Sequence, residues 1–136
     1  MAYGKAYYPA SPLHREISRI IRPASFAGRT PTLTPTTPLT VDLMHLGFPK
    51  AMGAHIIDDV VVDPGCEKTV DKVVEALDGR MPRAILLTHI HFDHAGGTGR
   101  LVERYLDTEV WVDERGAPHI ADPTRLVSSA RKVFGE

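Results

Sequence analysis

The stretch AILLTHIHFDHAGG, residues 84–97, decides the fold that the rest of the chain builds. Residues 84–88 are short, uncharged, mostly apolar and bounded by turn-forming residues, which is typical of a strand buried on both faces of a parallel sheet. His89 follows at the carboxyl end of that strand, where open α/β sheets place their ligand-binding loops. Gly96 and Gly97 let the backbone pass close beneath this turn before the next helix begins.

Strands and helices alternate on both sides of this stretch. The hydrophobic pattern predicts strands near residues 41–48, 54–63 and 109–112, with a turn at Asp58-Asp59. It predicts helices near residues 67–78, 98–106 and 123–134. We therefore expect an α/β fold with a mixed β-sheet and helices on one face.

The first 40 residues have a different character. Residues 1–29 contain five basic residues and one acid, and their apolar residues recur at helical spacing from Leu13 to Ile21. A short surface helix and an organelle transit peptide both fit this pattern. The prolines and threonines of residues 29–40 favour an extended linker. We expect a basic helical head and a Pro/Thr-rich linker in residues 1–40, and an αβ half-domain in residues 41–136.

Length and composition narrow the class of protein. The 136 residues are 43% hydrophobic, which fits one folded domain, and the net charge of −1 makes nucleic acid an unlikely partner. No apolar run approaches the roughly 18 residues of a membrane span. The single cysteine, Cys66, allows no intramolecular disulfide, so we expect a cytoplasmic protein.

The histidine cluster has the chemistry of a metal site. Imidazole and carboxylate groups are preferred ligands of zinc and similar divalent ions. Four such groups, on His89, His91, Asp93 and His94, suit two ions roughly 3.5–4 Å apart. We expect His89 and His91 to bind one ion and Asp93 and His94 the other, with zinc, iron or manganese as the metal. A chance cluster that binds metal adventitiously is the alternative.

The same residues resemble a known signature. His-x-His-x-Asp-His followed by Ala-Gly-Gly is similar to the signature of the metallo-β-lactamase superfamily, and residues 54–65 and 110–126 also resemble that family. The resemblance covers residues 41–136 and implies half of an αββα sandwich with metals at one edge. It implies a metal-bound hydroxide that attacks an ester, thioester, lactone, lactam or phosphodiester. It further implies a catalytic role for Asp93 and a supporting role for Asp63 behind the metal loop.

The chain also departs from that family. The family completes its metal site with later histidines and a bridging aspartate or cysteine, whereas only 42 residues follow His94 (136 − 94) and His119 is their single histidine. We place His119 in a loop or behind the metal ligands as a supporting residue, with a place at the metal site as the alternative. The chain resembles the amino-terminal half of the fold, so either a second copy or a complementary chain should cover the open sheet face, or the chain is a truncated product of a longer enzyme. We expect weak or absent hydrolysis by an isolated monomer.

Three functions fit these observations. The first is a metal-dependent hydrolase of a small-molecule substrate, whole or as one half of a site. The second is a non-catalytic metal-binding or assembly module. The third is a nucleic-acid-processing member of the same family that holds phosphate with its basic head.

Overall fold

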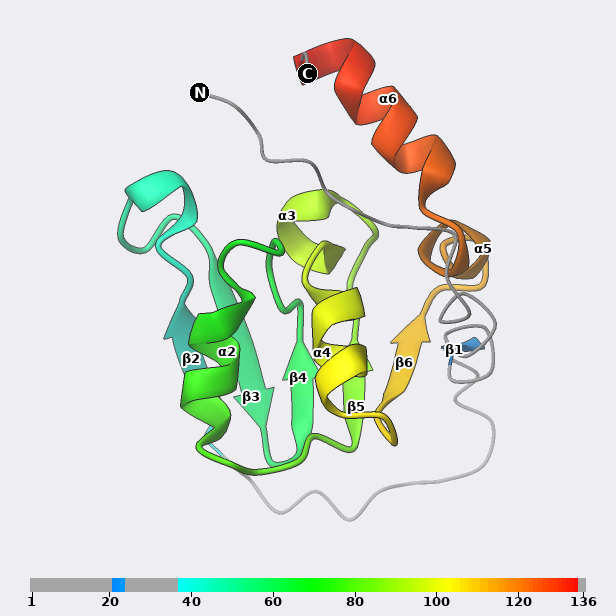
Figure 1. Cartoon of the computed structure of the whole chain (residues 1–136). Helices are drawn as coiled ribbons and strands as arrows, with labels where there is room; N and C mark the ends of the chain where they lie inside the picture. Colours follow the sequence, from blue (N-terminus) through cyan, green and yellow to red (C-terminus); the bar gives the residue numbers. More distant parts are fainter. Residues whose placement is uncertain (1–20, 24–36, 135–136) are drawn as a thin grey trace.

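A mixed six-stranded sheet with the order β1-β6-β5-β4-β3-β2 forms the centre of the protein (Figure 1). The computed structural model describes residues 21–23 and 37–134. β2 and β4 are antiparallel to β3. β4, β5, β6 and β1 run parallel to one another. The strands are β1 (Ile21–Pro23), β2 (Leu39–Asp42), β3 (Gly53–Ile57), β4 (Val60–Val62), β5 (Ala84–Leu86) and β6 (Glu109–Val112). The predicted mixed sheet is confirmed.

The hairpin between β3 and β4 turns where the sequence predicts. Ile57 pairs with Val60, and Asp58 between them takes a positive φ of 53°. Aspartate is one of the residues that tolerate this left-handed conformation, so the pair Asp58-Asp59 suits a two-residue turn.

Two helices cover one face of the sheet. Helix α2 (Val70–Leu77) lies between β4 and β5 in the chain, and α4 (Thr98–Arg104) lies between β5 and β6 (Figure 1). Both helices contribute to one buried apolar cluster with the alternate residues of the strands, among them Val61, Ile85 and Val110. Asp78 and Gly79 end α2 in left-handed conformations, which fits the predicted helix end near residue 78.

The opposite face of the sheet carries the other residues of each strand. One row crosses β2 to β6 in register: Thr40, His55, Val62, Leu86 and Trp111. The first two side chains of this row are exposed and the last three are half-buried. The apolar part of this face is therefore less completely covered than the part beneath α2 and α4.

The predicted strand over residues 41–48 is wrong beyond Asp42. Met44 and Leu46 take left-handed conformations, and His45–Gly47 forms a short 3-10 turn, η1. The carboxylate of Asp42 accepts hydrogen bonds from the backbone N–H groups of Met44 and Lys50, at 3.0 and 2.9 Å. These contacts turn the chain back on itself, which an apolar sequence pattern does not reveal.

The carboxyl-terminal helices differ in position from our expectation. A short helix α5 (Ala117–Ala121) precedes α6 (Thr124–Phe134). Figure 1 shows α6 extending away from the sheet, beyond α5, rather than lying beside α2 and α4. None of the α6 side chains that the structure describes is buried, so these side chains do not anchor the helix in the core beneath α2 and α4.

Only part of the amino-terminal predictions falls on residues that the structure describes. Ile21, which we expected on a helix, lies in β1 and pairs in parallel with Val110 of β6. Residues 1–20 and 24–36, which hold the rest of the predicted head and most of the linker, lie outside the described residues. The division at residue 40 stays a prediction. In the described ranges, no helix is both long and apolar enough to cross a bilayer.

Candidate metal centre

The candidate site lies where β4 and β5 end side by side. Asp63 directly follows β4, and Thr88 follows β5 after one intervening residue, Leu87. The backbone N–H of Asp63 donates to the carbonyl of Leu86 at 3.0 Å, so the ladder between the two parallel strands continues up to the site. Asp63 is 8% exposed. A carboxylate this buried is stable only when hydrogen-bond donors surround it.

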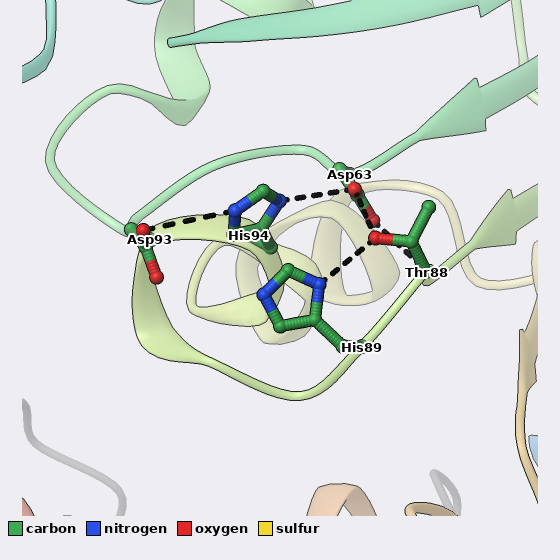
Figure 2. A network of polar contacts seen from close by, with 5 residues as sticks. All are labelled: Asp63, Thr88, His89, Asp93 and His94. Carbon is green, nitrogen blue, oxygen red and sulfur yellow. Dashed lines mark hydrogen bonds and ion pairs between the residues drawn. The ribbon is translucent and has the colours of Figure 1, made fainter. Parts of the chain in front are cut away.

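Asp63 receives those donors from residues 88–94, which carry the histidines and are called the histidine loop here (Figure 2). The backbone N–H of Thr88 donates to Oδ1 at 2.8 Å, and the Thr88 hydroxyl donates to Oδ2 at 2.5 Å. Nδ1 of His94 lies 3.0 Å from the same Oδ2. Asp63 therefore joins the beginning of the histidine loop to its end.

The loop brings two of the predicted ligands closest together. The rings of His89 and His94 lie 3.9 Å apart between centroids. Asp63, His89 and His94 form a group whose potential ligand atoms all lie within 4.8 Å of one another. Because both oxygens of Asp63 already accept hydrogen bonds, we regard this carboxylate as a partner of His94 rather than as a metal ligand.

The other predicted ligands lie at the edge of this group. The ring of His91 stands edge-on to that of His89, with 4.8 Å between centroids. Oδ2 of Asp93 lies 3.7 Å from Nε2 of His94, and the Asp93 side chain is 41% exposed. His119 lies half-buried on the helix α5 rather than in the predicted loop, and it is not among the residues grouped around Asp63.

Glycines allow the loop to sit tightly against the start of α2. The N–H of Gly65 donates to the carbonyl of His94 at 3.0 Å, and the N–H of Gly97 donates to the carbonyl of Gly65 at 2.7 Å. A Cβ on Gly97 would lie 3.0 Å from Cγ2 of Val70, and one on Gly96 would lie 2.5 Å from the carbonyl oxygen of Phe92. The close backbone passage predicted at these two glycines is confirmed.

The donor set fits a divalent metal ion. Three imidazoles and the Asp93 carboxylate are the nitrogen and oxygen ligands that zinc binds, and the hydrogen bond from His94 to a buried carboxylate is typical of a metal-binding histidine. A zinc site usually has three or four protein ligands. The three histidines and Asp93 are therefore too few to fill the coordination spheres of two ions.

Sequence reasoning missed Thr88. Its hydroxyl contacts Asp63 on one side and lies 3.0 Å from Nδ1 of His89 on the other. The available signal was its position, as the one hydroxyl residue between the apolar strand and the first histidine.

Comparisons with known proteins agree with this geometry. The family model described as the Metallo-beta-lactamase superfamily matches residues 58–134, more than half of the chain. Similar curated proteins include hydroxyacylglutathione hydrolases from several bacteria. The one from Hamiltonella defensa is 46% identical over 52 residues, which cover 38% of this chain and 20% of that protein. The one from Serratia proteamaculans is 38% identical over 65 residues (45% and 26%), and the one from Salmonella typhi is 38% identical over 82 residues (55% and 32%). The matched regions thus span a third or less of these relatives.

Because the family model matches more than half of the sequence and includes the whole histidine loop, the chain belongs to the metallo-beta-lactamase superfamily.

Proposed function

We propose that this chain provides the metal-binding half of the active site of a thioester hydrolase. The observation that carries the proposal is the histidine loop at the carboxyl ends of β4 and β5, braced by the buried carboxylate of Asp63. The names of the similar proteins describe hydrolysis of an acyl group carried by glutathione, and an acyl group on a thiol is a thioester. A small acyl thioester is therefore the substrate class we favour over other esters, lactones and lactams.

Each residue of the loop has a distinct role in this proposal. His89 and His91 would hold one ion, and Asp93 and His94 would hold the second, so each ion needs further ligands from elsewhere. A bound zinc, iron or manganese ion would polarise the thioester carbonyl and lower the pKa of a bound water. The exposed carboxylate of Asp93 is the group best placed to accept a hydrogen bond from the attacking water and orient it.

A complete site requires ligands from outside the described half-domain. Two ions need more ligands than His89, His91, Asp93 and His94 provide, and the region matched here spans at most a third of the similar hydrolases. We propose that a second copy or a complementary chain packs on the sheet face that carries Val62, Leu86 and Trp111. The half-burial of these apolar side chains supports that placement.

The test combines metal analysis with turnover. The chain would be purified with zinc, iron or manganese, and its metal content, molecular mass and hydrolysis of an S-acyl glutathione would be measured together. His89→Ala/His91→Ala should lower metal content and abolish turnover, whereas the control His45→Ala, in the 3-10 turn η1 outside the histidine loop, should leave both unchanged. Wild-type metal content and activity in the double variant would refute the proposal.

A non-catalytic metal-binding module is the second candidate. It is favoured by the short ligand set, which suffices for one ion held without turnover. Metal stoichiometry separates the two functions: two ions with turnover in an assembled species support the hydrolase, and one ion without turnover in any assembly supports the module.

A further inference from the structure

The Thr88 hydroxyl lies between the buried carboxylate and the first histidine of the loop (Figure 2). Oγ1 of Thr88 is 2.5 Å from Oδ2 of Asp63 and 3.0 Å from Nδ1 of His89. A threonine hydroxyl has one proton to donate and lone pairs to accept with, whereas a carboxylate can only accept. The hydroxyl proton therefore points to Asp63, at a separation typical of a charge-assisted O–H···O⁻ bond.

This direction fixes the protonation of the His89 ring. With its only proton directed at Asp63, Thr88 can only accept from His89, so Nδ1 of His89 must carry a hydrogen. The opposite tautomer would bring the unprotonated Nδ1 against an oxygen lone pair with no hydrogen between them. In the neutral ring, Nε2 of His89 is then the unprotonated nitrogen, which is the form that binds a metal ion.

We propose that Thr88 is a positioning residue that relays the charge of Asp63 to His89 and holds its Nε2 ready for metal. Asp63 acts on His94 directly, through the contact of 3.0 Å to Nδ1. Its hydrogen-bonded route to His89 passes through the Thr88 hydroxyl. One buried carboxylate thus orients both rings by two separate routes. Only the benefit to metal affinity rests on the proposed function, because the tautomers are a property of the metal-free protein.

The two routes predict different effects for two substitutions. Thr88→Val keeps the shape of the side chain but removes the hydroxyl, so it should release the His89 tautomer and leave that of His94 unchanged. Asp63→Asn should disturb both histidines. Thr88→Ser retains the hydroxyl and should restore the wild-type state.

A matched control lies on the open sheet face, which is the face opposite α2 and α4. Oγ1 of Thr40 lies 3.1 Å from Nδ1 of His55, a threonine–histidine contact outside the histidine loop. Thr40→Val removes a similar hydrogen bond and should alter His55 alone, with no effect on the loop.

The first measurement is the ¹⁵N NMR spectrum of the histidine side chains in the metal-free chain, which distinguishes protonated from unprotonated ring nitrogens. At a pH where the rings are neutral, we expect an unprotonated Nε2 on His89 in the wild type and in Thr88→Ser, and a mixture of tautomers in Thr88→Val. A wild-type His89 protonated on Nε2, or a Thr88→Val spectrum identical to the wild type, would overturn the proposal. A change in His94 as large as that in His89 would overturn the separate routes.

The second measurement is zinc affinity by competition with a chromophoric chelator. Loss of a hydrogen bond behind a ligating histidine typically weakens metal binding about 10–100-fold. We expect a loss of that order for Thr88→Val and none for Thr40→Val, with circular dichroism as the check on folding. Equal affinities of Thr88→Val and wild type would overturn the role in metal binding. A wild-type chain that binds no zinc would instead refute the proposed function, while the NMR result still decides the tautomer.

Discussion

Replacing Gly65 by alanine should destabilise the fold more than the same change at Gly79. Both glycines have a positive φ, +86° at Gly65 and +77° at Gly79, so an alanine at either position takes a left-handed conformation that costs about 1–2 kcal/mol. The surroundings differ. A Cβ on Gly79 would have no neighbour within 4 Å, whereas one on Gly65 would lie 2.4 Å from Cδ1 of Leu43 and 3.0 Å from Oγ1 of Thr69.

The overlap with Leu43 sets the size of the difference. Leu43 is fully buried, so its side chain cannot swing away without disturbing the core. Overpacking of this kind costs about 1–3 kcal/mol. We therefore expect Gly65→Ala to lower the free energy of unfolding by about 2–5 kcal/mol and Gly79→Ala by about 1–2 kcal/mol.

Urea unfolding of the metal-free variants, followed by circular dichroism, measures both losses. A double-mutant cycle with Leu43→Ala tests the cause, because removing the Leu43 methyl groups should make Gly65→Ala less costly than it is in the wild type. Equal losses at the two glycines, or a Gly65→Ala cost that Leu43→Ala does not reduce, would refute the steric argument.

Three further predictions concern the core, the loop after β2 and the open sheet face. Leu101→Ala should lower the free energy of unfolding by about 2–5 kcal/mol in urea titrations because Leu101 is fully buried on α4. The control Leu106→Ala, at a residue 66% exposed, should change the free energy of unfolding by less than about 0.5 kcal/mol. Equal losses in the two variants would contradict the assigned core. The backbone N–H groups of Met44 and Lys50 lower the pKa of Asp42 below its ordinary 3.8, so its contribution to stability is present above pH 3.8 and is lost as the pH falls through the lower folded value. Asp42→Asn should therefore flatten the acid limb of a plot of urea midpoint against pH, and an unchanged limb would show that the carboxylate contributes nothing there. Leu86→Lys should convert a wild-type dimer into monomers in sedimentation velocity, because it places a charge in the apolar row of the open face; a wild type already monomeric at micromolar concentration would contradict the proposed assembly.

Local sequence patterns were sufficient wherever a structure depends on residues close together in the chain. The β3–β4 hairpin follows from two apolar runs separated by Asp58-Asp59, and α2 follows from the spacing of Val70, Val73 and Leu77 before Asp78-Gly79. The histidine loop was placed correctly after a buried strand for the same reason. Its metal-binding chemistry was expected from residue types within six positions, His89 to His94.

Only the tertiary structure decided what depends on residues distant in the chain. Asp63 and Thr88 are 25 positions apart and meet because β4 and β5 pair in parallel and end at the same edge; no periodicity in either segment predicts the hydroxyl between carboxylate and imidazole. The turn after β2 was misjudged because Asp42 reaches the N–H of Lys50, eight residues on, and this contact overrides the apolar pattern of residues 43–48. The position of α6 was misjudged because an amphipathic pattern reports that one face is apolar but not which surface will cover it. Sequence thus specified the elements and the ligand types, and strand pairing specified which side chains meet, since hydrogen bonds form only between groups that the fold has already brought within about 3 Å.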